Sequence, residues 1–120
     1  MALKIDVVAG KPGLARVLIS GSLDSNTAPQ LEQSLTGIDG TVLLIVLDMQ
    51  DLEYISSAGL RVVFAAVKRQ NAKGGELVFT NMGPNVKKVF EIVKALPSLN
   101  VFASLEEMDD YLAAFQKRKH

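Results

Sequence analysis

The strongest constraint on the fold of this chain is a run of six aliphatic residues, Val42 to Leu47, that ends at Asp48. A continuous aliphatic run closed by a charge is typical of a strand that is covered on both faces of its sheet. We therefore expect Thr41 to Asp48 to form a strand at the centre of a sheet. The chain has 120 residues, 48% of them hydrophobic and 22% charged, which suits one folded domain with one core.

Strand and helix patterns alternate around that run. The expected strands are residues 3–7, 14–20, 41–48, 76–80 and 99–102, and the expected helices lie between Thr27 and Gly40, from Ser56 or Ser57 to Gly74, from Pro84 to Pro97, and from Ser104 onward. The order ββαβαβαβα predicts an α/β fold with a mostly parallel sheet and an N-terminal antiparallel hairpin. We expect a single domain over residues 1–120, with a basic tail at about 116–120.

The ends of these elements carry turn and capping signals. Gly10 to Gly13 reads as a hairpin turn, and residues 49–54 as a short connection after the central strand. Thr27 with Gln30, and Ser104 with Glu107, have the spacing of capping boxes. Apolar spacing predicts that Leu31, Leu35 and Ile38, Leu60 and Val63, and in the last helix Leu105, Met108, Leu112 and Phe115, face the core. Four acids near the start of that last helix, Glu106, Glu107, Asp109 and Asp110, are interpreted as favourable charge at a helix N-terminus.

The composition argues against several classes of function. There is no cysteine, and the single histidine is the terminal residue His120, so thiol chemistry, a Ser-His-Asp triad and a metal site of several histidines are disfavoured. Thirteen basic and thirteen acidic residues give a net charge of zero, which provides no general attraction to nucleic acid or anionic lipid. No spanning segment or signal peptide is evident. We expect a cytoplasmic protein that is not an enzyme and needs no cofactor or metal.

Two loops follow the carboxyl ends of expected strands, which is where working residues gather in α/β folds. They are residues 21–27 and residues 48–59, and the second contains Ser56 and Ser57 at the start of a helix. One of these serines could cap the helix. A serine nucleophile would need a base that this chain lacks. A phosphoacceptor would gain from the helix N-terminus, which stabilises a bound phosphate.

Three motifs resemble those of one family, the STAS-domain anti-sigma factor antagonists. They are the stretch Tyr54-Ile55-Ser56-Ser57-Ala58-Gly59-Leu60 after the aliphatic strand, the loop from Gly21 to Pro29, and Asn81-Met82-Gly83-Pro84 leading into Val86 to Glu91. The resemblance covers essentially the whole chain. It implies the STAS fold and a protein that releases a sigma factor or another client by binding its inhibitor.

The resemblance also implies the site. The family pattern Asp-Ser-Ser-Gly-Leu-Gly puts the phosphoacceptor on Ser57, which we expect to be exposed. Ser56 then stands in place of the acid, Ala58 in place of the second serine and Arg61 in place of the last glycine, while Gly59 and Leu60 match. The residues expected at or near the partner contact are Asp24, Ser25, Asn26, Thr27, Tyr54, Ser56, Ala58, Gly59, Leu60 and Arg61.

The implied partners are a serine kinase with the histidine-kinase-like ATPase fold, which doubles as the anti-sigma factor, and a phosphatase of the PP2C type. No contact with nucleic acid or membrane is expected, and the chain is expected to be a monomer. The main alternative is a module of the same fold that senses a small ligand or scaffolds an assembly without phosphorylation. A hydrolase or nucleotide-using enzyme and the cytoplasmic domain of a transporter are weaker alternatives, since the chain has no phosphate loop and no spanning segment.

Overall fold

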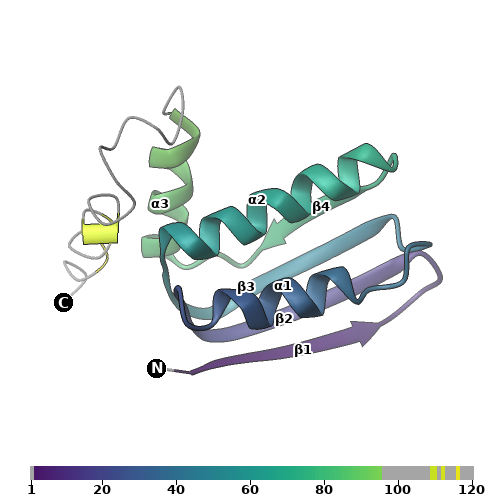
Figure 1. Ribbon diagram of the computed structural model, residues 1–120, viewed down its shortest axis with the longest axis horizontal. Coiled ribbons are helices and arrows are strands. Elements are labelled where there is room, and N and C mark those ends of the chain that lie inside the picture. The colour runs from purple at the N-terminus through teal and green to yellow at the C-terminus, as the bar shows by residue number, and fades with distance from the viewer. Residues whose placement is uncertain (1, 96–108, 111, 113–115, 117–120) are drawn as a thin grey trace.

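The computed structural model describes residues 2–95, 109, 110, 112 and 116. Its elements are β1 (Leu3–Ala9), β2 (Leu14–Leu23), α1 (Ala28–Thr36), β3 (Leu44–Ile55), α2 (Ser57–Ala72), β4 (Glu76–Thr80) and α3 (Pro84–Ala95). Figure 1 shows α1 and α2 side by side on one face of the sheet, with α3 at the end where α2 begins. The helices and strands match the order expected from the sequence as far as α3. The strand expected at 99–102 and the start of the last helix lie outside the described residues.

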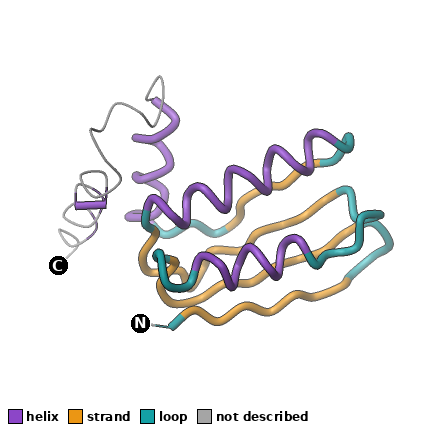
Figure 2. The backbone as a smooth tube through the Cα atoms, viewed as in Figure 1, coloured by secondary structure: helices purple, strands orange, loops and turns teal. Residues whose placement is uncertain are grey.

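The sheet has the predicted mixture of pairings. The strand order is β1-β2-β3-β4, in which β1 and β2 are antiparallel while β2 with β3 and β3 with β4 are parallel. The strands form one layer behind α1 and α2 (Figure 2). This confirms the α/β class and the N-terminal hairpin, and it puts β3 between two neighbours, as the aliphatic run predicted. The expectation that this strand is covered on both faces is wrong for the described residues, since Leu44 and Val46 are only half-buried while Ile45 and Leu47 are buried.

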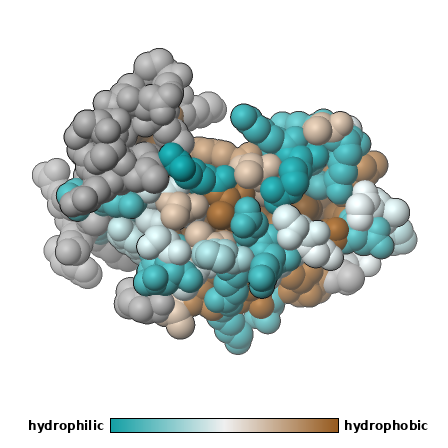
Figure 3. Space-filling view, viewed as in Figure 1, coloured by the Kyte–Doolittle hydropathy of each residue, from teal (hydrophilic) through white to brown (hydrophobic). Residues whose placement is uncertain are grey.

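The core lies between the sheet and its two covering helices. Val17, Ile45 and Leu47 from the strands and Leu31 and Leu60 from the helices are all buried. The outer sides of the helices carry hydrophilic side chains, with apolar ones between them (Figure 3). This distribution is the one that an amphipathic helix acquires when its apolar stripe packs on a sheet.

At its far end β3 differs from the expectation. The strand continues for seven residues past Asp48, so residues 49–54 are strand and not a connection. They pair with β2, which continues three residues past its expected end at Ser20, up to Leu23 opposite Ile55. The pairing shifts by one residue between Leu18 and Ser20 and again after Gly21. Such bulges break the two-residue alternation, which is why the sequence pattern hid this part of the strand.

Asp48, the charge that closes the aliphatic run, is a buried link between three strands. Its side chain is only 4% exposed and accepts from Arg16 on β2 at 2.7 Å and from the Gln50 amide at 3.0 Å. Asn81, which follows β4 and has a φ of 58°, donates to both carboxylate oxygens at 3.3 and 3.4 Å. Burial raises the pKa of Asp48, but these donors together lower it below the ordinary value.

The start of α1 also differs from the expectation, because the Thr27–Gln30 capping box does not form. Thr27 occupies the cap position, but its hydroxyl donates to Ser22 O at 2.8 Å and accepts from the Asp24 amide at 2.9 Å. Gln30 reaches across to β1 and donates to Leu3 O at 3.1 Å. Both side chains therefore hold the loop and the sheet edge rather than the helix end.

Candidate functional site

The two adjacent serines have different roles at the junction of β3 and α2. Ser56 is the N-cap, with extended backbone at φ −102° and ψ 177°, and its hydroxyl accepts from the Gly59 amide at 3.3 Å. Its carbonyl accepts from the Leu60 amide at 2.9 Å. Ser57 is the first residue of α2. The neutral hydroxyl of Ser56 thus makes the capping contact at the position where the family pattern has an acid.

Ser57 is held by an acidic side chain from far along the sequence. Its hydroxyl donates to Oδ1 of Asp109 at 2.7 Å, and its amide donates to the same oxygen at 2.8 Å. Ser57 is 2% exposed, so the expectation of an exposed hydroxyl is wrong for this conformation. The reason is electrostatic, because a carboxylate is well placed at a helix N-terminus, where amide hydrogens lack partners in the helix.

The two loops expected to share the site do lie together. The Ser56 amide donates to Leu23 O at 2.9 Å, which joins the start of α2 to the end of β2. In the next turn the Asp24 carboxylate accepts from the amides of Asn26 and Thr27 at 2.9 and 3.1 Å. Burial raises the pKa of Tyr54, and the negative charges of Asp109 and Asp24 raise it further.

The residues expected at the site differ in their accessibility. Ser25, Asn26 and Arg61 are exposed, Asp24, Tyr54 and Ala58 are half-buried, and Thr27, Ser56, Gly59 and Leu60 are buried. Only the first two groups offer surface to a partner. Gly59 has the clearest structural role of these residues, because a Cβ at this position would lie 2.7 Å from Leu23 Cγ. Its lack of a side chain lets α2 approach β2 and does not open access to the serine.

Gln116 is a second contact that the sequence pattern did not reveal. Its side chain donates to Ile55 O at 2.8 Å and accepts from the Ile55 amide at 2.9 Å. Both backbone groups of the last residue of β3 are thus hydrogen-bonded, as they would be by a paired strand. The same amide group donates to Leu112 O at 3.1 Å. Leu112 is buried, as its helical spacing predicted. Spacing could show that Asp109, Leu112 and Gln116 share one helix face, but not what that face contacts.

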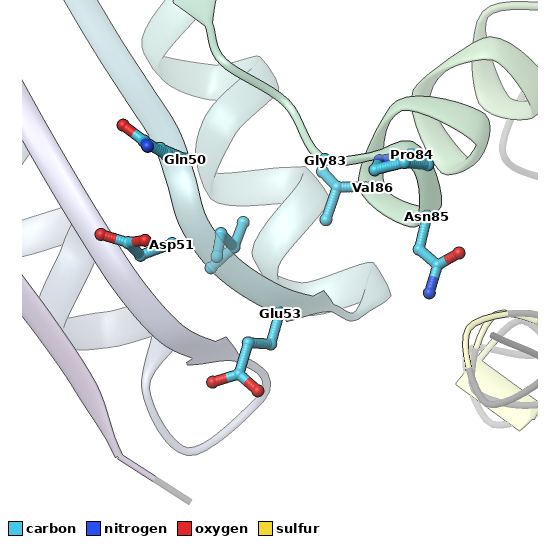
Figure 4. A pocket seen from close by; sticks show the side chains of 8 residues that line it. Gln50, Asp51, Glu53, Gly83, Pro84, Asn85 and Val86 are labelled. Carbon is cyan, nitrogen blue, oxygen red and sulfur yellow. The ribbon is translucent and has the colours of Figure 1, made fainter. Parts of the chain in front are cut away.

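A cleft of about 390 Å³ adjoins this junction, between the far half of β3 and the start of α3. Its lining is Gln50, Asp51, Leu52, Glu53 and residues 83–86. In Figure 4, Asn85 points away from the cleft toward the C-terminal residues, and its side chain donates to Gln116 O at 3.3 Å. Two carboxylates and no basic side chain line the cleft, which suits it poorly to a phosphate-bearing ligand.

Among residues 2–95 and the four described residues beyond them, no three histidine, aspartate or glutamate side chains gather where they could hold a metal ion. Within the same residues, every helix is too short or too polar to cross a bilayer.

Comparison with known sequences gives a consistent result. The family model for the STAS domain matches residues 7–108. A Bordetella bronchiseptica protein, BtrV, which is named as an anti-sigma factor antagonist, is 37% identical over 105 residues, covering 87% of this chain and 88% of the relative.

Comparison with solved structures agrees on the fold. The anti-sigma factor antagonist SpoIIAA in its unphosphorylated form superposes with a TM-score of 0.69 at 20% identity, covering 76% of this chain and 81% of that one. The phosphorylated form of SpoIIAA, a Bacillus cell fate determinant, gives a TM-score of 0.64 at 20% identity, covering 74% and 82%.

Proposed function

The chain belongs to the STAS domain family and, within it, to the anti-sigma factor antagonists, and we propose that it works as a phosphorylation-controlled partner switch. Unmodified, it binds an anti-sigma factor serine kinase of the histidine-kinase-like ATPase fold, and the kinase then releases a sigma factor or another client. Phosphorylation of Ser57 ends this complex, and a phosphatase of the PP2C type restores it. The protein acts as a monomer in the cytoplasm and catalyses no reaction itself.

The position of Ser57 carries this proposal. It is the first residue of α2, while its neighbour Ser56 is engaged as the helix cap. A phosphate on Ser57 adds about −1.5 to −2 charges at pH 7, beside the positive end of the helix dipole. The dipole stabilises such a charge by about 0.3–2 kcal/mol, so the modified domain is expected to stay folded. SpoIIAA, solved in both states, is a precedent for a STAS domain that keeps its fold when phosphorylated.

The chemistry at Ser57 is a simple exchange of groups. Its Oγ forms a bond to the γ-phosphorus of ATP, ADP leaves, and the hydroxyl proton is released. In the reverse direction water attacks the phosphoserine, inorganic phosphate leaves and the hydroxyl is regenerated. The kinase and the phosphatase supply the catalytic groups for both steps.

Binding energetics explain how this exchange changes the partner. The surface around α2 that a kinase would cover includes the exposed residues Ser25, Asn26 and Arg61. Leaving a charge buried without a full partner in an interface costs roughly 2–5 kcal/mol. At about 1.4 kcal/mol per factor of ten, this weakens binding roughly 30- to 5,000-fold. A local change is thus sufficient to exchange one partner for another.

The first experiment locates the phosphate. A candidate serine kinase of the ATPase type is incubated with the protein and ATP, and the product is mapped by mass spectrometry. The wild type is expected to carry one phosphate on Ser57, Ser57→Ala none, and the control Ser56→Ala one. Phosphate retained by Ser57→Ala would falsify the proposed site.

The second experiment measures the switch. Isothermal calorimetry with the same kinase is expected to show that Ser57→Asp binds at least 30-fold more weakly than the wild type, with an unchanged circular dichroism spectrum. The control is Lys11→Ala, an exposed substitution in the turn between β1 and β2, which is expected to bind as the wild type does. Equal binding of wild type and Ser57→Asp rules the switch out. Melting shifts with small ligands, without any phosphorylation, would favour a ligand-sensing module instead.

A further inference from the structure

The side chain that contacts Ser57 occupies the place that a phosphate on Ser57 would need. Oδ1 of Asp109 accepts from both the hydroxyl and the amide of Ser57, at 2.7 and 2.8 Å. A carboxylate on the first amide of α2 makes the type of contact that a phosphate oxygen makes at a helix N-terminus. Esterification of the Ser57 hydroxyl removes one of these two bonds outright, because the donated proton is lost.

Asp109 is held in this place by a second anchor. Gln116 bonds both backbone groups of Ile55, at 2.9 and 2.8 Å, and its backbone oxygen accepts from Asn85 at 3.3 Å. Leu112 between them is 1% exposed. We call Asp109, Leu112 and Gln116 the C-terminal cover. Its three members are spaced three and four residues apart, so they lie on one face of a helical backbone.

The cover and a phosphoserine exclude each other for two reasons. A phosphate at Ser57 would carry about −1.5 to −2 charges at hydrogen-bond distance from the Asp109 carboxylate, and like charges this close repel. A kinase, in turn, has no route to the hydroxyl of Ser57, a residue that is 2% exposed, while Asp109 is bound to it. Asp109 must therefore leave Ser57 before the Ser57 hydroxyl can be phosphorylated.

We propose that the C-terminal cover is an autoinhibitory contact that withholds Ser57 from its kinase and is expelled once Ser57 is phosphorylated. The inference rests on the proposed phosphorylation of Ser57. By linkage, the docked cover disfavours phosphorylation at equilibrium by the same free energy by which phosphorylation disfavours docking. The cover thereby opposes modification of Ser57, and Asp109, Leu112 and Gln116 leave their contacts in the phosphorylated protein.

The expulsion can be measured without any kinase. Amide hydrogen exchange followed by NMR reports on the Ile55 amide, whose acceptor is Gln116. The exchange rate of the Ile55 amide is expected to rise at least tenfold in each of Ser57→Asp, Asp109→Ala and Gln116→Ala. The Leu47 amide in the core is expected to keep its protection. Asp110→Ala is the matched control, because Asp110 is an exposed neighbour with the same charge. Unchanged exchange at Ile55 in Ser57→Asp would overturn the expulsion.

The withholding is measured with the kinase. Initial rates of Ser57 phosphorylation are expected to rise at least threefold in both Asp109→Ala and Gln116→Ala and to stay at the wild-type value in Asp110→Ala. Equal rates in all four proteins overturn the autoinhibition and leave the proposed function intact. If none of them is phosphorylated at Ser57, the proposed function fails and the inference falls with it.

Discussion

Gly59 offers the sharpest test of how α2 is seated on the sheet. A Cβ at this position would lie 2.7 Å from Leu23 Cγ, 3.0 Å from Leu23 Cδ2 and 3.0 Å from Leu23 O. Alanine within a helix is favoured over glycine by about 1 kcal/mol. Overpacking of a well-filled site costs about 1–3 kcal/mol, and the upper part of that range, about 2–3 kcal/mol, applies here because two of the three close atoms, Cγ and the carbonyl oxygen, cannot swing away as the end of a long side chain would. We therefore expect Gly59→Ala to lose about 1–2 kcal/mol of unfolding free energy.

Urea denaturation followed by circular dichroism measures this loss. The control is Gly40→Ala, where no heavy atom lies within 4 Å of an added Cβ and a change within about 0.5 kcal/mol is expected. In a Leu23→Ala background two of the three short contacts disappear, so Gly59→Ala is expected to cost less there by about 0.5–3 kcal/mol. A Gly59→Ala protein as stable as the wild type, or more stable, would refute the close approach of α2 and β2.

Three further outcomes follow from polar contacts away from Ser57. The pKa of Asp48 is lowered in the fold, so its ionisation stabilises the protein above about pH 4, the ordinary range of an aspartate, and this contribution is lost as the pH falls through the lowered pKa. Asp48→Asn is expected to cost about 1–3 kcal/mol at pH 7 and to flatten the pH dependence of stability below pH 4 in urea titrations. Thr27→Val removes two hydrogen bonds from a buried hydroxyl and is expected to lower stability by about 1–3 kcal/mol, whereas the exposed control Ser25→Ala stays within about 0.5 kcal/mol. Asn81→Ala loses the donor to Asp48 and puts a Cβ-bearing residue without a polar side chain at φ 58°, so thermal melting is expected at a lower temperature than for Asn81→Gly, which keeps that backbone relaxed.

The elements up to α3 follow from local patterns, except in the far half of β3 and at the start of α1. The aliphatic run predicted a central strand, and the apolar spacing from Leu60 to Val67 predicted α2 with its start at the two serines. Patterns of this kind work because burial on one face is decided by residues a few positions apart. The motif from Tyr54 to Leu60 that points to the family can be recognised for the same reason, because it is a short continuous stretch at the junction of β3 and α2.

The missed contacts of Ser57 and Ile55 join residues far apart in the sequence. Asp109 lies 52 positions from Ser57, and Gln116 lies 61 positions from Ile55. The position of an acid at the start of one helix does not show whether its carboxylate accepts from the N-terminal amides of that helix or of another one. Thr27 shows the same ambiguity at short range, because a hydroxyl three residues before a glutamine can be used by the preceding loop instead of the helix.

The two register shifts between β2 and β3 have a consequence for how such chains can vary in length. Across the paired span β3 uses two more residues than β2, and the second shift restores the inward direction that the first one reversed, so that Ile55 points into the core. A one-residue insertion or deletion between Asp48 and Ile55 would turn every following side chain of β3 to the opposite face of the sheet. The first residues of α2 would then point away from the end of β2. Length changes are therefore expected at the Gly10 to Gly13 turn, where residues 10–13 are all exposed, and not along this stretch.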